Sequence, residues 1–81
     1  MLVAFNEFVS FVDNHSSLVR SLLYDQVKKD EYVALETAIA KEILLFQKAV
    51  TDPERRTHVE NLEVASKEFN NYIKEQMDKS M

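Results

Sequence analysis

The two histidines, His15 and His58, carry the chemistry of widest use near neutral pH, since imidazole binds metals and transfers protons there. His15 lies at helical spacing from Phe8, Val12 and Val19, so it could act as a ligand, a pH switch or a phospho-acceptor. Activation needs an acid one turn away, and positions 11, 12, 18 and 19 hold none. We therefore expect His15 to be a partly buried or interfacial imidazole satisfied by a neighbouring polar group.

His58 follows Glu54 by four residues, which places both side chains on one face of a helix. Two such groups can contribute to a metal site, but a tight site needs three or four ligands. The sequence contains no HExxH or ExxH pattern. We expect a solvated pair in the first turn of a helix, and no metal or cofactor.

Glutamates recur through the middle and the end of the chain. They are Glu31, Glu36, Glu42, Glu54, Glu60, Glu63 and Glu68. Paired acids perform acid–base catalysis when burial shifts their pKa values. Here they have Lys or Arg within helical reach or fall on a polar face, which indicates a solvated surface. Ser16 and Ser17 adjoin His15 without a group to orient it. We therefore predict no catalytic residue, and a protein that is not an enzyme.

Composition excludes several other classes of function. The net charge is −4 and no segment is basic, which disfavours nucleic acid and anionic membrane surfaces as partners. The absence of cysteine removes disulfides and thiolate zinc sites and fits a cytoplasmic location. No apolar run approaches the roughly 20 residues of a membrane span, and the N-terminus lacks the basic region of a signal peptide.

The positions of these side chains depend on helices, because the 81 residues include one proline and no glycine. Tight turns and phosphate-binding loops usually need glycine, which adopts a positive φ without steric cost. We predict an all-α fold, a single domain over residues 1–81, with three helices in an up-down-up bundle that could dimerise. The expected helices cover about 2–27, 30–50 and 53–78.

The first predicted helix has a continuous seam with steps of three and four. It consists of Phe5, Phe8, Val12, His15, Val19, Leu22 and Gln26. The seam passes through residues 13–17 without a change of phase, which favours one helix. The alternative is a break there, with Asn14 or Ser16 as a new N-cap.

The link between the first two helices has neither Gly nor Pro. Lys28 and Lys29 suit a helix C-terminus, and Asp30 suits an N-cap, so we predict a tight turn there. The alternative is one helix from residue 2 to 50, about 70 Å long. A single partner helix could not cover such a rod, which would have to dimerise.

The second boundary is better defined. Pro53 is tolerated in a first helical turn, Asp52 can cap it, and Thr51 and Glu54 have capping-box spacing. We expect a helix to end near Val50 and another to start near Pro53. The adjacent Arg55 and Arg56 are interpreted as a surface pair bonded to Asp52 or Glu60.

Apolar positions at helical spacing define the expected core. The most buried positions should be Leu22, Leu35, Ile39, Phe46, Leu62, Phe69 and Ile73. The N-terminal segment has more apolar residues than one buried face needs, and exposed apolar patches often mark partner sites. We predict that Phe5, Phe8, Phe11 and Val12 bind another helix, from a protein partner or a second copy.

Residues 27–45 also carry a family resemblance. Val27-Lys28-Lys29-Asp30, Leu35, Ala40-Lys41-Glu42 and Leu44-Leu45 resemble the helical hairpin of flagellar export chaperones of the FlgN/FliT type. The resemblance covers about a third of the chain and implies a small acidic helical protein that holds a secretion partner. Bacteriocin-immunity bundles and chemoreceptor sensor bundles are similar in general form.

The sequence predicts non-enzymatic protein binding through an apolar helical surface, as in an adaptor, export chaperone or inhibitor. The alternative is a sensory bundle that holds a small molecule between its helices. The first should expose an apolar stripe, and the second should enclose a cavity with convergent polar groups.

Overall fold

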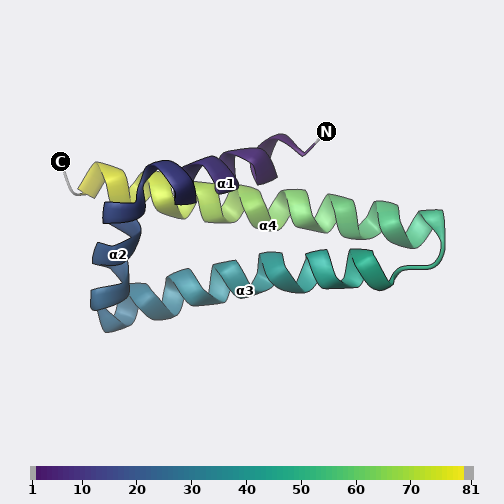
Figure 1. Cartoon of the computed structure of the whole chain (residues 1–81), viewed down its shortest axis with the longest axis horizontal. Coiled ribbons are helices and arrows are strands. Elements are labelled where there is room, and N and C mark those ends of the chain that lie inside the picture. Colours follow the sequence, from purple (N-terminus) through teal and green to yellow (C-terminus); the bar gives the residue numbers. More distant parts are fainter. Residues whose placement is uncertain (1, 80–81) are drawn as a thin grey trace.

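The computed structural model describes residues 2–79 and contains four α-helices (Figure 1). They are α1 (Val3–Asn14), α2 (Ser16–Tyr24), α3 (Gln26–Lys48) and α4 (Asp52–Lys79). The all-α prediction is confirmed. The prediction of three helices is wrong, because the expected first helix is divided into α1 and α2.

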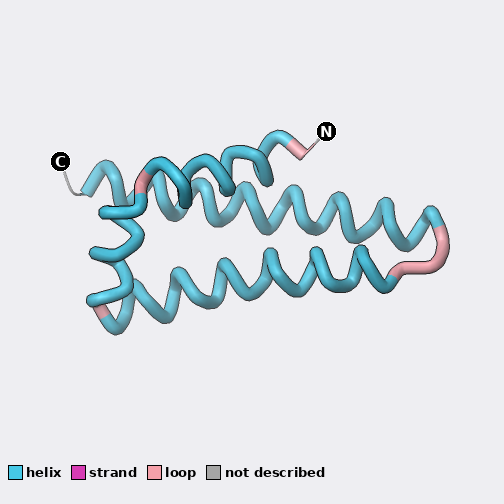
Figure 2. Tube along the Cα trace, in the orientation of Figure 1, coloured by secondary structure: helices cyan, strands magenta, loops and turns pink. Residues whose placement is uncertain are grey.

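Helices α3 and α4 form a long antiparallel hairpin, and α1 lies along the C-terminal half of α4 (Figures 1 and 2). Helix α1 runs in the same direction as α4, and α3 runs in the opposite direction. The short α2 crosses the end of the bundle to join α1 to α3. Consequently only half of the hairpin is covered by a third helix.

The break between α1 and α2 falls at His15, whose backbone has φ −124° and ψ 42°. Its N–H still donates to the carbonyl of Phe11, and its carbonyl accepts from Val19, each at 3.0 Å. The chain therefore bends while its hydrogen bonding continues. Residues 13–17 are Asp, Asn, His and Ser, which are weak helix formers. The seam keeps its phase through the bend, which explains why one helix was expected.

The link between α2 and α3 falls at Asp25, not at residues 28–30. Asp25 has extended backbone, and its carboxylate accepts from the N–H groups of Val27 and Lys28 at 3.0 and 3.1 Å. Asp25 is thus the N-cap that was assigned to Asp30. Asp30 lies inside α3, where it accepts a hydrogen bond from Gln26.

Replacing Asp25 with Ala should destabilise the protein by about 1 kcal/mol, because two N–H groups in the first turn of α3 lose their acceptor. Urea unfolding followed by circular dichroism measures the change. Asp30→Ala is the matched control, with an expected loss of less than about 0.5 kcal/mol. Equal losses of stability in the two variants would contradict the assignment of Asp25 as the N-cap of α3.

The turn between α3 and α4 agrees with the predicted boundary. Helix α4 begins at Asp52, with Pro53 in its first turn. The hydroxyl of Thr51 accepts from the N–H of Glu54, and the Glu54 carboxylate accepts from the N–H of Val50, both at 3.4 Å. This arrangement resembles the expected capping box. It differs in that Glu54 accepts from the N–H of Val50 and not from the N–H of Thr51.

The core forms where the helices converge near α2. Its buried cluster consists of Leu22, Tyr32, Ile39, Leu62, Phe69 and Ile73. Phe69 is fully buried, and its ring meets those of Phe8 and Tyr32 edge-on, with centroids 4.6 and 5.2 Å apart. The prediction is confirmed for five of its seven positions; Leu35 is half-buried and Phe46 is exposed.

Tyr32 makes the stability of the protein sensitive to alkaline pH. Burial and the nearby Glu36 carboxylate raise the pKa of Tyr32 from 10.0 to about 12. The folded state therefore favours the neutral phenol, and its contribution to stability is complete below pH 10 and lost as the pH rises toward 12.

We expect the free energy of unfolding of wild type to fall as the pH rises from 10 to 12. In Tyr32→Phe the slope of the free energy of unfolding against pH should be smaller. Urea titrations at a series of pH values measure it. Tyr24→Phe is the control, because Tyr24 is 91% exposed and should leave the slope unchanged. An identical slope in wild type and Tyr32→Phe would show that Tyr32 does not cause the pH dependence.

Candidate functional site

The four residues predicted to bind a partner all lie on α1 and are half-buried. Phe5, Phe8, Phe11 and Val12 pack against the core cluster of the same chain, with Phe8 stacked edge-on against Phe69. Much of their apolar surface is therefore used within the molecule. Their role toward another protein stays a prediction.

Polar contacts also hold α1 on α4. The backbone N–H of Ala4 donates to Glu63 at 3.0 Å, and the Asn70 amide donates to the carbonyl of Ala4 at 2.8 Å. Asn70 also reaches the Glu7 carboxylate at 3.4 Å, and Lys74 lies 3.9 Å from the same carboxylate. Asn70 is 2% exposed, so these contacts fix the register of α1. Sequence reasoning missed Asn70, because a polar residue beside an apolar stripe gives no signal of burial.

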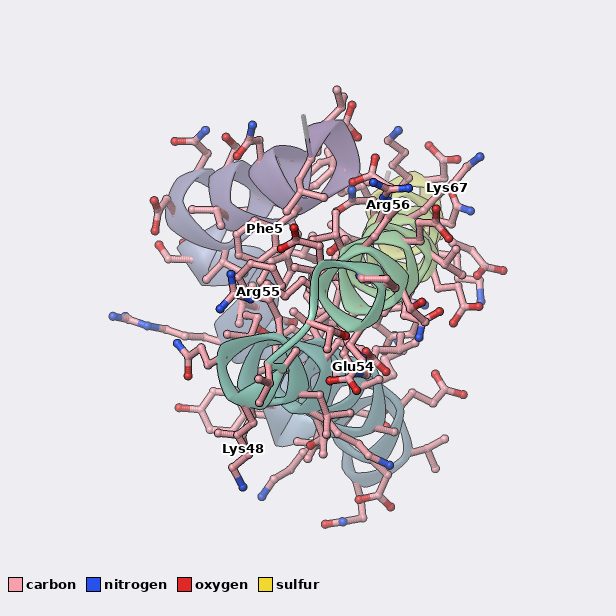
Figure 3. All side chains as sticks on the ribbon, turned by 90° about the vertical axis from the view of Figure 1, so that its right-hand side faces the viewer. Phe5, Lys48, Glu54, Arg55, Arg56 and Lys67 are labelled. Atoms are coloured by element: carbon pink, nitrogen blue, oxygen red, sulfur yellow. The ribbon has the colours of Figure 1, made fainter. Side chains whose placement is uncertain are left out.

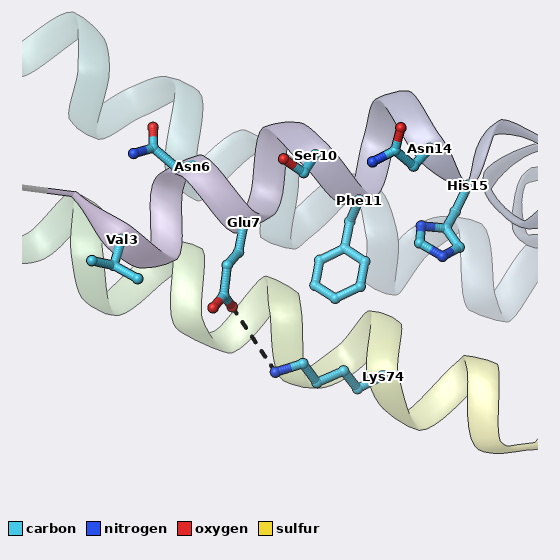
Figure 4. Close-up of a pocket in the computed structure, with 8 residues that line it drawn as sticks. All are labelled: Val3, Asn6, Glu7, Ser10, Phe11, Asn14, His15 and Lys74. Atoms are coloured by element: carbon cyan, nitrogen blue, oxygen red, sulfur yellow. Dashed lines mark ion pairs between the residues drawn. The ribbon is translucent and has the colours of Figure 1, made fainter.

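A cleft of about 520 Å³ runs along the outer side of α1 (Figure 4). Its walls come from α1, His15 and the Lys74 side chain of α4. Phe11 supplies the aromatic wall, and the Lys74 ammonium lies 6.0 Å from the centre of its ring, within range of a cation–π contact. The cleft is open to solvent and mostly apolar, which distinguishes it from the enclosed polar cavity expected of a sensor.

His15 is at the end of this cleft, where α1 meets α2. Its ring lies 5.4 Å from that of Phe11. Its Nδ1 atom is buried and has no hydrogen-bond partner among residues 2–79. The predicted partly buried position is confirmed, and the predicted polar partner at Nδ1 is not found within this range.

His58 does not pair with Glu54. Its Nδ1 lies 3.0 Å from the carboxylate of Glu42, so the contact joins α4 to α3. Both side chains are mostly buried, at 24% and 19% exposure. The expected solvated pair is therefore wrong: the interhelical pair helps to align the hairpin.

The surface that most clearly lacks a partner is the far half of the hairpin. Residue 42 faces residue 58, so α3 beyond residue 43 lies opposite the first turns of α4. Helix α1 begins level with Glu63 and does not reach this part. Apolar residues of the helix–helix face are only partly covered there: Ile43 and Val59 are half-buried, and Phe46 and Val50 are exposed. We call these four residues the distal face.

Phe46 shows the effect of the missing cover. It follows Ile39 by two turns on the same face of α3. Ile39 is 2% exposed, whereas Phe46 is 39% exposed. Val50, in the loop that follows, is 84% exposed. Sequence periodicity places Phe46 in the core, but the buried cluster does not extend past the level at which α1 begins.

Other kinds of site have less support. The part of the chain that the structure describes holds no group of three His, Asp or Glu side chains arranged to bind a metal ion. Among the helices of residues 2–79, none is both long enough and apolar enough to cross a membrane. No protein-family model, curated protein or solved structure matches the chain.

Proposed function

We propose that the protein is not an enzyme, and that it binds another protein through an apolar helical surface, as a cytoplasmic adaptor, export chaperone or inhibitor does. The single observation that carries this proposal is the exposure of Phe46 on the core-facing side of α3. A phenylalanine at that position is shielded from water only when another helix lies over the hairpin. Phe5, near the start of α1, is the half-buried phenylalanine of α1 that lies nearest the level of this surface.

Site-specific photo-crosslinking in the native host tests the proposal. A photoreactive phenylalanine analogue at position 46 should give a discrete adduct with one other polypeptide. Leu44 provides the matched control, because it is 49% exposed and lies on the opposite side of α3. Adducts that are the same at both positions, or absent at both, would contradict the proposal.

A competing version of the same function is self-association through α1 or the hairpin. Light scattering over a concentration series on wild type and on Phe46→Glu separates the two versions. A monomer at every concentration supports a different protein as the partner. If wild type is a dimer and Phe46→Glu is a monomer, the partner at the Phe46 surface is a second copy of this chain.

A second candidate is a sensory protein that takes a small molecule in the open cleft beside Phe11, although this cleft is not the enclosed polar cavity expected of a sensor. The volume of the cleft suits a compact ligand, and the Lys74 ammonium would favour an anionic one. A thermal-shift screen of small aromatic carboxylates on wild type and Phe11→Ala tests it. Hits that stabilise wild type but not the variant support the sensor; no stabilisation of wild type removes it.

A further inference from the structure

We propose that the distal face receives a short amphipathic helix of another protein, and that this helix carries acidic side chains along its edges. The inference rests on the proposed function and deepens it, since it names the length and charge of the partner segment.

The length follows from the space that α1 leaves uncovered. Helix α4 begins at Asp52, and α1 begins level with Glu63. The stretch of α4 that α1 does not reach is therefore residues 52–62, which span about 16 Å at a rise of about 1.5 Å per residue. A helix of about three turns would cover it. Such a helix would continue the path of α1 along the hairpin and would bury Phe46 and Val59.

The charge follows from two arginines at this end of the hairpin, Arg55 and Arg56 (Figure 3). Neither forms an ion pair within residues 2–79, so the expected pairing with Asp52 or Glu60 is not found there. Arg55 donates from Nε to the backbone carbonyl of Ala49 at 3.3 Å, which steadies the side chain without neutralising it. An apolar face beside two cations without ion-pair partners is complementary to an amphipathic helix with carboxylates at its edges.

The neighbouring charges at this end of the hairpin are of both signs. Glu42 is already paired with His58, and the carboxylate of Glu54 accepts from the N–H of Val50. Lys48, Asp52 and Glu60 form no ion pair within residues 2–79 either. With the two arginines, the unpaired side chains near the turn are three cations and two carboxylates, which favours a partner of negative charge. In the first turns of α4 the arginines also oppose the helix dipole, so they are poorly placed to stabilise that helix.

The same charges argue against a second copy of this chain as the occupant. A two-fold dimer through the distal face would be self-complementary and would bring the arginines of both copies to one interface. Like charges across an interface weaken binding. A partner of opposite charge is therefore the better fit.

Binding of synthetic helical peptides tests the inference. Three fluorescent peptides, each about three helical turns long, share leucines at positions i, i+3, i+4 and i+7 and carry flanking Glu, Gln or Lys. Fluorescence anisotropy at low salt should show the Glu peptide binding wild type about tenfold more tightly than the Lys peptide, since each exposed ion pair adds only a modest amount. This preference should shrink as ionic strength rises.

Variants separate the contribution of charge from that of apolar contact. The single variant Arg56→Glu should abolish or reverse the preference for the Glu peptide. The double variant Arg55→Glu with Arg56→Glu should do the same. Phe46→Glu should weaken all three peptides, whereas Leu44→Glu should weaken none. Circular dichroism checks that each variant is folded; if the double variant unfolds, the result for Arg56→Glu decides.

Each result has a defined meaning. Equal binding of the three peptides, lost in Phe46→Glu, overturns the charge inference and leaves the proposed function standing. Binding that Phe46→Glu does not weaken places the peptides elsewhere and overturns the inference. No binding of any peptide by wild type also overturns it, and the crosslinking at position 46 then decides the proposed function by itself.

Discussion

Phe69→Ala should bring the protein close to its unfolding midpoint at room temperature, with an expected loss of about 3–5 kcal/mol. Phe69 is 0% exposed and packs against both Phe8 of α1 and Tyr32 of α3. Its truncation would leave a cavity at the point where three helices meet. A chain of this size has a total stability on the order of 5 kcal/mol, so the loss is comparable with the whole. Thermal and urea unfolding followed by circular dichroism measure it.

Phe46→Ala is the matched comparison for this prediction. Phe46 has the same side chain on the same pattern of helical spacing, but it is 39% exposed and lies beyond α1. Its truncation should cost about 1 kcal/mol, because part of its surface is already in water. Similar losses in the two variants would mean that Phe46 is buried in solution, by a second copy or by a different packing of α1.

Asn70→Ala should loosen α1 from the hairpin, with an expected loss of about 2 kcal/mol. Its amide is the buried donor to the carbonyl of Ala4 and also contacts Glu7. Without it, a buried carbonyl at the start of α1 has no side-chain donor from α4. Hydrogen exchange should show lower protection in α1 than in wild type, while α3 and the middle of α4 change less.

Asn71→Ala is the control, since Asn71 is the adjacent residue and is exposed. It should leave both the stability and the exchange of α1 close to those of wild type. If Asn70→Ala behaves in the same way, the hydrogen bond to Ala4 does not hold α1, and the apolar contacts of Phe8 are sufficient.

The boundary of the core connects these predictions to the function. At the end near α2, helix α1 lies along the hairpin, whereas at the far end α3 and α4 lie without a third helix (Figure 1). A substitution at the covered end should therefore act on folding, and a substitution at the distal face should act on binding. Phe69 and Phe46 are the pair of residues that separates the two effects.

The sequence by itself determined the helical class of the fold and the position of one turn. Without glycine the chain has few ways to form tight turns, and its steps of three and four placed Leu22, Ile39, Leu62, Phe69 and Ile73 correctly in the core. The turn before Pro53 was also predictable, because proline and the capping residues act locally.

Only the tertiary structure decided where the helices break and which apolar residues stay in water. The seam through His15 and the charges near Asp30 fit several arrangements, and the choice depends on how α2 crosses the end of the bundle. Phe46 has the periodicity of a core residue, but burial requires a covering helix, and α1 does not reach it. Periodicity specifies the face of one helix; the length and path of the neighbouring helices determine whether that face is covered.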